Sequence, residues 1–233
     1  METDLLKDKV VLVTGAGHTT GREIARAFAA RGAALAVEDI SPVNLDETVQ
    51  IAAAYGGKVA GYTADVSKKM PVQRLITRTL EDFGKLDFLV NCANVEPQAP
   101  VLSMDEWDLL RTLQVNLAGV FLLTQIAGRV MKTLGGGTIL HVVRCGQDAR
   151  KSAAYAAKAG ALAFVTRAAA ELEKDNVRLR ALSSGMCCRK NGETTPVPCT
   201  GTVKKYAGLP AAVLALCRED LAGDPVVCVR FSS

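Results

Sequence analysis

The sequence predicts an α/β fold in which helices cover both faces of a doubly wound parallel sheet of about seven strands. Short apolar runs rich in β-branched residues alternate with amphipathic stretches along the 233 residues. The intervening stretches are long enough for helical crossovers, which join parallel strands by right-handed connections. No repeat and no linker interrupts the alternation, so we expect a single domain over residues 1–233.

In the first half, each expected strand is a short buried run, and glycine follows each expected helix. Glycine is the residue that most often ends a helix, because it adopts the left-handed conformation without steric cost. The expected strands are Val10–Thr14, Ala33–Glu38, Val59–Thr63 and Leu86–Asn91, and the expected helices are Gly21–Arg31, Leu45–Tyr55 and Pro71–Phe83.

The second half continues the same alternation with longer helices. A helical stretch over Met104–Leu134, with a break expected near Gly119, ends at three consecutive glycines. The segment Met186–Ala207 carries two prolines and many polar residues, so we expect a loop there. The remaining expected elements are strands Thr138–Val143, Val177–Leu182 and Val226–Arg230 and helices Ala153–Lys174 and Leu209–Cys217.

Composition excludes several classes of protein. The formal net charge is +4 with no run of five basic residues, so we expect no nucleic-acid partner. No stretch of 18 apolar residues is free of charge, and the N-terminus does not resemble a signal peptide, so we expect no membrane partner. The seven cysteines are irregularly spaced, which favours reduced thiols in the cytoplasm over a metal site.

A glycine-containing loop joins the first strand to the first helix and reads Thr14-Gly15-Ala16-Gly17-His18-Thr19-Thr20-Gly21. Such a loop lets the backbone approach a pyrophosphate at a helix N-terminus. Asp39 follows the second strand, where a carboxylate binds ribose hydroxyls and repels a 2′-phosphate, which favours NAD over NADP. Asp65-Val66 follows the third strand, and Asn91 ends the fourth. Each carboxylate could also be an ordinary turn residue, but their joint placement predicts a dinucleotide site.

These motifs resemble the short-chain dehydrogenase/reductase family over nearly the whole chain. They are Thr14-Gly15…Gly21, Asp39, Asp65-Val66, Asn91-x-Ala93, Asn116, Lys158 and Gly185. The resemblance implies a Rossmann-type fold and an NAD cofactor bound by Gly15, Gly17, Thr19, Gly21, Asp39, Asp65, Val66, Asn91 and Lys158. It also implies proton transfer between a tyrosine and the substrate oxygen, assisted by a lysine, a serine and an asparagine.

Two cofactor motifs depart from the family pattern. Thr19 stands at the middle glycine of TGxxxGxG, where a side chain would meet the phosphates, although Gly17 restores some backbone freedom. Asn94 replaces the glycine of the motif Asn-Asn-Ala-Gly. We therefore expect NAD binding to be weak or lost.

The catalytic residues depart further. Asn116 and Lys158 match their motifs, but Val143 stands at the serine position and cannot bond a carbonyl oxygen. Tyr155 lies three residues before Lys158, whereas the family spacing is four. In a regular helix this places Ala154 at the tyrosine's position and turns Tyr155 about 100° away, unless a bulge returns it.

Three hypotheses follow. The first is a catalytically impaired structural or regulatory subunit, forming a homo-oligomer (dimer or tetramer) or pairing with an active paralogue, as in the heteromeric dehydrogenases of anaerobic aromatic degradation. The second is an active NAD-dependent oxidoreductase that interconverts an alcohol and a ketone, with Tyr155 and Lys158 transferring the proton. The third is a nucleotide-binding sensor.

Overall fold

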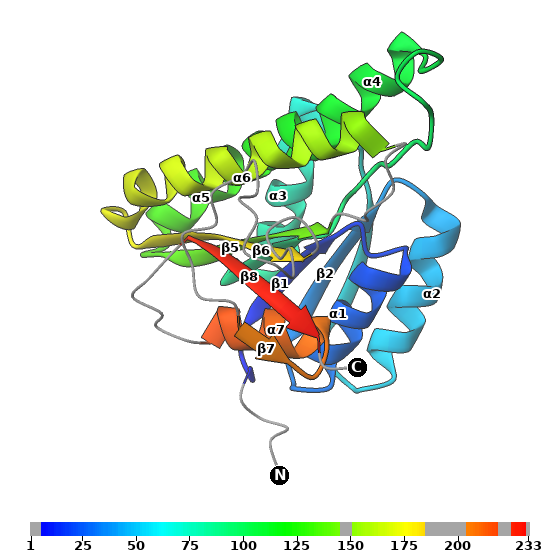
Figure 1. The fold of residues 1–233 in the computed structure, drawn as a ribbon. Coiled ribbons are helices and arrows are strands. Elements are labelled where there is room, and N and C mark those ends of the chain that lie inside the picture. The colour runs from blue at the N-terminus through cyan, green and yellow to red at the C-terminus, as the bar shows by residue number, and fades with distance from the viewer. Residues whose placement is uncertain (1–5, 145–150, 185–203, 219–224, 232–233) are drawn as a thin grey trace.

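The computed structural model describes residues 6–144, 151–184, 204–218 and 225–231, and within them a parallel sheet lies between two helical layers (Figure 1). The strand order is β3-β2-β1-β4-β5-β6-β8-β7. Within the described residues, all the strand pairs run parallel, as the crossover lengths predict. The strands are β1 Val10–Thr14, β2 Ala34–Asp39, β3 Val59–Thr63, β4 Phe88–Asn91, β5 Gly137–Arg144, β6 Val177–Ser184, β7 Lys204–Tyr206 and β8 Val226–Phe231.

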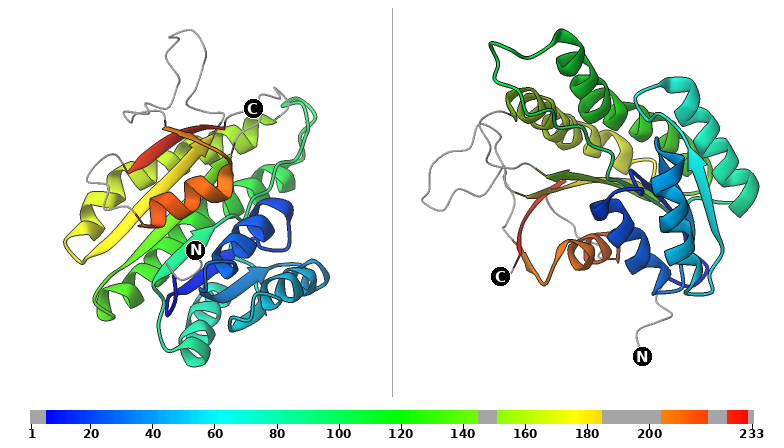
Figure 2. Two further views of the ribbon diagram at one scale, coloured as in Figure 1. Left: turned by 90° about the horizontal axis from the view of Figure 1, so that it is seen from below. Right: turned by 90° about the vertical axis from the view of Figure 1, so that its right-hand side faces the viewer.

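Helices cover both faces of the sheet and divide the core in two (Figure 2). On one face, α3, α5 and α6 pack on the sheet through one apolar cluster, and on the other, α1 and α7 pack through a second. The doubly wound α/β architecture predicted from the alternation is therefore confirmed. The helices are α1 Thr19–Ala29, α2 Pro42–Ala53, α3 Lys69–Phe83, α4 Glu106–Leu113, α5 Gly119–Thr133, α6 Ser152–Glu173 and α7 Leu209–Arg218, with a π-helical turn, η1, over Gln114–Ala118.

Two expectations about the elements are wrong. The segment Met186–Ala207 is not entirely loop, because β7 pairs there with the last strand and makes an eighth strand. A strand of three residues is too short to show an alternating pattern, and its pairing depends on a neighbour that is distant in sequence. The long helix does not break near Gly119 but continues through η1 into α5. A Cβ at Gly119 would lie 3.3 Å from the carbonyl oxygen of Val66, so glycine serves close packing there.

The combined helix Glu106–Thr133 is long and apolar enough to cross a membrane by length and composition alone. Within the fold, 44% of its most apolar window is buried, and its residues pack against α3, α6 and the sheet. This packing accounts for the apolar composition of the helix, as in the core helices of globular domains.

Candidate nucleotide site

Two glycines of the loop after β1 are required by close backbone packing. Gly15 has φ +65°, and a Cβ there would lie 2.6 Å from the backbone nitrogen of Ala93. A Cβ at Gly21 would lie 2.2 Å from the carbonyl oxygen of Gly15. Only glycine fits these positions, which let the start of α1 pack directly on the loop.

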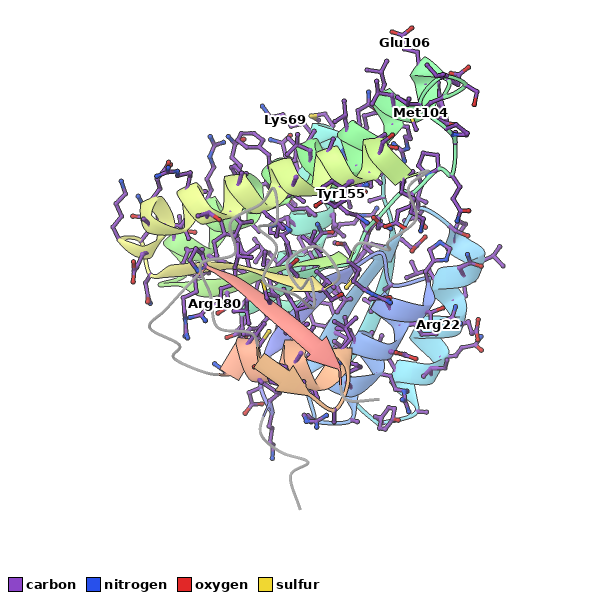
Figure 3. The ribbon with its side chains drawn as sticks, viewed as in Figure 1. Arg22, Lys69, Met104, Glu106, Tyr155 and Arg180 are labelled. Atoms are coloured by element: carbon purple, nitrogen blue, oxygen red, sulfur yellow. The ribbon has the colours of Figure 1, made fainter. Side chains whose placement is uncertain are left out.

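Residues of α1 and α2 hold the same loop in place. The Arg22 guanidinium donates to the carbonyl oxygen of Gly17 at 2.8 Å, and the Thr48 hydroxyl donates to that of Ala16 at 2.8 Å (Figure 3). Thr19, the first residue of α1, is exposed. The first turn of α1 contains no acidic residue, and its N-cap His18 makes no side-chain hydrogen bond to it. Its free N–H groups can therefore face an anion.

Asp39 is buried at the end of β2 and is oriented by two backbone amides. Its Oδ2 accepts from the amide of Gly17 at 2.9 Å, and its Oδ1 accepts from the amide of Ser41 at 2.9 Å. A Cβ at Gly17 would lie 2.8 Å from Asp39 Cγ, so this glycine serves the close approach of the carboxylate. A carboxylate has about four acceptor positions, and each oxygen keeps one for a ribose hydroxyl.

Asp65, beyond the end of β3, is held by neighbours on two elements. Its carboxylate accepts from the hydroxyl of Ser67 at 2.7 Å and pairs with Arg111 of α4 at 3.0 Å. Burial would raise the pKa of Asp65, but these hydrogen bonds and the Arg111 charge outweigh it and hold the pKa below its usual value. The carboxylate is therefore ionised at neutral pH and fixed in position.

A third carboxyl group, which the sequence analysis did not identify, lies beside these two. Glu38 of β2 is buried, and its Oε2 accepts from the amide of Gly15 at 3.4 Å. Burial, followed by the charges of Asp39 and Asp65, raises its pKa well above the usual value. The available signal was a glutamate within an otherwise apolar strand, which is rare unless the side chain is paired or protonated.

A cavity of about 410 Å³ opens at the carboxyl ends of β1, β2 and β4, the edge at which open α/β sheets bind ligands. It adjoins these carboxylates and the phosphate loop. It is lined by Gly15, His18, Thr20, Gly21, Glu38, Asp39, Ile40, Ala64, Asp65, Val66, Cys92, Ala93, Asn94, Val95, Arg111 and Val115. Thus Gly15, Gly21, Asp39, Asp65 and Val66 meet at one cavity, whereas Gly17, Thr19 and Asn91 lie behind or beside it.

Asn91 belongs to a buried polar chain beneath the site. Its Oδ1 accepts from Thr14 Oγ1 at 2.7 Å, its Nδ2 lies 3.1 Å from His141 Nδ1, and His141 Nε2 lies 2.8 Å from Thr124 Oγ1. The Thr124 hydroxyl donates to the Val120 carbonyl, so it accepts from His141, whose proton is on Nε2. Burial lowers the pKa of His141 to about 3, and the imidazole is neutral. His141 therefore joins Asn91 to Thr124 as a neutral imidazole.

Asn116 fastens the loop after β4 to the long helix. Its Oδ1 accepts from the amide of Val95 at 2.9 Å, and its Nδ2 donates to the carbonyl of Val95 at 2.7 Å. The side chain lies in η1, where the wider helical turn allows it to reach the loop. Asn116 thus aligns the cavity wall with α6, which contacts η1.

The Lys158 ammonium is occupied by groups of the chain itself. This side chain, 5% exposed, donates to Glu96 Oε1 and to the carbonyl oxygen of Arg144. Lys151 donates to the other oxygen of Glu96 at 2.7 Å. Burial would raise the pKa of Glu96, but hydrogen bonds from the two lysines lower it below its usual value. The sequence analysis missed Glu96 and Lys151, because 62 residues separate Glu96 from Lys158.

The remaining expected catalytic residues do not converge with Lys158. Val143 is buried in the apolar core, where it offers no hydrogen-bond donor. Ala154 is buried one turn before Lys158, and α6 is α-helical from Ser152 to Glu173, without the bulge that would return Tyr155. Tyr155 is half-buried near the start of α6, and its hydroxyl bonds no residue within the described part of the chain (Figure 3).

Arg144, which follows Val143 at the end of β5, reaches across to the phosphate loop. Its guanidinium donates to the hydroxyl of Thr20, the second residue of α1, at 2.7 Å. This contact joins the two sides of the site between the cavity and Lys158. Gly185, which the family resemblance includes, lies outside the described residues.

These residues suit one half of a dinucleotide. The cavity, the close-packed glycines and Asp39 fit an adenosine and its phosphates. The group that would hold the second ribose is largely taken up, because Glu96 and the Arg144 carbonyl engage two of the three N–H donors of Lys158. Of the expected catalytic residues, none lines the cavity as the described residues define it.

Comparison with known proteins identifies the relatives of the chain. The family model described as short chain dehydrogenase matches residues 9–194. An uncharacterized oxidoreductase of Thermotoga maritima is 42% identical over 134 residues, which cover 58% of this chain but only 53% of the relative. A (2S)-[(R)-hydroxy(phenyl)methyl]succinyl-CoA dehydrogenase subunit, BbsD of Thauera aromatica, is 30% identical over 78% of this chain and 74% of its own length.

Solved structures agree with the sequence matches. A short chain dehydrogenase from Mycobacterium smegmatis superposes with a TM-score of 0.80 at 32% identity, covering 98% of this chain and 95% of that one. Xylitol dehydrogenase with bound NAD+ superposes with a TM-score of 0.74 at 29% identity, covering 78% and 73%. The fold is therefore shared along the whole described chain.

Proposed function

The chain belongs to the short-chain dehydrogenase/reductase family, and we propose that it is a catalytically impaired member that serves as a structural or regulatory subunit. One observation carries the proposal. The Lys158 ammonium is held by Glu96 and a backbone carbonyl, while the residue one turn before it is the buried Ala154. These contacts support the proposal that the proton-transfer pair implied by the family resemblance is not assembled.

The expected loss of activity follows from the chemistry of that pair. A positioned acid–base group contributes on the order of 10²–10⁴ in rate. Here we expect the tyrosine hydroxyl to be turned off the site, because α6 is a regular helix in which Tyr155 lies about 100° from Ala154, and Val143 provides no donor to polarise a substrate oxygen. Because such residues act as a unit, the two losses do not simply multiply.

We propose weak nucleotide binding with NAD preferred over NADP. Asp39, Asp65 and Glu38 surround the cavity. Two of these carboxyls would repel a 2′-phosphate as anions. The subunit role is supported by the relative from Thauera aromatica, which is itself described as a dehydrogenase subunit.

The exposed side of the long helix supports assembly into a homo-oligomer or with an active paralogue. Helix α4 projects beyond the body of the domain (Figure 1). Large apolar side chains are exposed along it and around it, namely Val101, Leu102, Trp107, Leu109, Leu110 and Phe121. Exposed apolar patches of this kind mark interaction surfaces. We propose a cytoplasmic dimer or tetramer, for which sedimentation at micromolar concentration is the test.

An activity panel tests the catalytic proposal. The purified chain is expected to show background turnover with alcohols, ketones and hydroxyacyl thioesters in the presence of NAD or NADH. Inserting one alanine between Tyr155 and Lys158, together with Val143→Ser, is expected to raise turnover above background. Mass spectrometry of untagged protein purified from its source identifies any stoichiometric paralogue.

The second candidate is an active NAD-dependent oxidoreductase that interconverts an alcohol and a ketone. It is supported by Asn116 and Lys158, which occupy their motif positions, and by the half-buried Tyr155 in the first turn of α6. Ready turnover by the unaltered chain that Tyr155→Phe abolishes would establish this candidate and contradict the first.

A further inference from the structure

We infer that this site takes an adenine nucleotide that ends at its phosphates, such as adenosine diphosphate, in preference to a dinucleotide, an inference that rests on the proposed function in taking the cavity as the nucleotide site. The structure provides an adenosine cavity and a cationic phosphate end. Beyond that end, contacts within the chain take up the groups that would hold a second nucleoside.

The cavity matches an adenosine in size and chemistry. Its volume of about 410 Å³ lies toward the small end of ligand sites. Apolar walls from Ile40, Ala64 and Val66 suit a base, and the oriented carboxylate of Asp39 suits ribose hydroxyls. The glycines at 15 and 21 bring the N-terminus of α1 to its edge.

Arg144 does not line the cavity, but it contacts Thr20, which does, and so offers a cationic group for a terminal phosphate at that edge. Its guanidinium is fixed beside the first turn of α1 by the bond to Thr20. A guanidinium has five N–H donors, and this bond takes one of them. The terminal phosphate of a nucleoside diphosphate carries more negative charge than the internal diphosphate of a dinucleotide, and it can accept a bidentate pair of bonds. Arg144 therefore favours the nucleotide that ends there.

Beyond Arg144, the Glu96 carboxylate competes with any second ribose. One of its oxygens bonds Lys158 and the other bonds Lys151. Glu96 and the Arg144 carbonyl take two of the three N–H donors of Lys158, so a ribose can use only one without displacing them. Neutral ribose hydroxyls that also replaced Glu96 on Lys158 would exchange an ion pair for weaker neutral acceptors. They would also leave the half-buried carboxylate with one lysine instead of two. The nicotinamide half of a dinucleotide thus gains little binding free energy.

Calorimetric titration of the full chain with ADP and with NAD tests this. ADP is expected to bind at least as tightly as NAD. Glu96→Gln frees Lys158 from its ion pair. It is expected to tighten NAD binding roughly tenfold, the value of one charge-assisted bond, and to change the affinity for ADP less than twofold. Arg144→Met is expected to weaken the binding of ADP roughly tenfold and the binding of NAD by a smaller factor. Glu106→Gln removes the same charge at the exposed start of α4, away from the cavity, and serves as the control (Figure 3).

The outcomes separate this inference from the proposed function. Wild-type NAD binding ten times tighter than ADP, or no binding of either at millimolar concentration, overturns the inference and leaves catalytic impairment standing. Turnover in the activity panel overturns the proposed function whatever the ratio of affinities. The wild-type comparison needs no variant, so it decides the question even if Glu96→Gln fails to fold.

Discussion

The two halves of the site differ in what the chain does with its polar groups. In the adenosine half, Asp39 and the start of α1 face a cavity, and their bonds to the chain leave acceptors and donors for a ligand. In the catalytic half, Lys158, Glu96 and Arg144 are joined to one another and to the phosphate loop. The polar groups of one half remain open to the cavity, and those of the other half bond groups of the chain.

This difference shows that binding and chemistry place unequal demands on a fold. The adenosine half needs a tight turn and a carboxylate at the end of one strand, which are local features. The catalytic half needs β5, η1 and α6 in register, and a rotation of about 100° at one helical position displaces its hydroxyl. A family member can therefore keep the first while it loses the second.

Gly21→Ala is expected to disrupt the adenosine half and to have the largest effect on stability and nucleotide binding. The new Cβ would lie 2.2 Å from a backbone oxygen, so α1 and the loop must separate. We expect destabilisation by roughly 3 kcal/mol together with loss of nucleotide binding. Chemical denaturation and calorimetry measure the two effects.

Gly160→Ala is the matched control for this substitution. Its Cβ would lie 3.4 Å from the flexible side chain of Leu117, within helix α6. Replacing a glycine inside a helix by alanine is expected to stabilise by up to about 1 kcal/mol. Equal destabilisation by both variants would mean that helical glycines in general, and not the phosphate loop, explain the loss.

The sequence predicted the fold well, because local periodicity specifies most of it. Strands such as Val10–Thr14 and the glycine loop are encoded in contiguous residues. The three-residue β7 and the continuity of the helix through η1 depend on tertiary packing, and the sequence analysis missed both.

The site was only partly predictable for the same reason. The backbone positions of the expected residues follow from their order along alternating strands and helices. The partners of those residues do not, because Glu96 meets Lys158 and Arg144 meets Thr20 only after the sheet has assembled. Val143 was assigned to the serine position from the sequence, but the contact of the next residue, Arg144, with Thr20 could not be predicted in this way.

Acid should lower the free energy of unfolding by an intermediate amount, because it acts on the buried His141 beneath the site. The pKa of His141 is about 3 in the folded chain, against an ordinary 6.5. As pH falls below 6.5, the unfolded chain binds the proton first, so folding loses up to about 1.4 kcal/mol per pH unit until pH 3. We expect a loss of about 2 kcal/mol between pH 6.5 and 5, measured by urea denaturation.

His141→Gln should flatten this pH dependence relative to the unaltered chain. His18, the only other histidine in the sequence, is exposed, and His18→Gln serves as the control that should leave the slope unchanged. If the slope persists in His141→Gln, groups other than His141 titrate in this range, and the assignment of the acid sensitivity to His141 is wrong.

Thr19→Gly is expected to have the smallest effect, which is a change in nucleotide affinity. Thr19 replaces a family glycine, so removing its side chain should ease the approach of phosphates to α1. However, the side chain is exposed and does not line the cavity as described, and glycine loosens the first turn. We therefore expect ADP and NAD to bind less than fivefold more tightly, and by equal factors, because both carry the same diphosphate past this residue.

Thr19→Ser keeps the hydroxyl while it removes the methyl group, and it separates crowding from hydrogen bonding. A tenfold gain for NAD alone would mean that the loop, and not the Glu96–Lys158 pair, is what disfavours the second nucleoside.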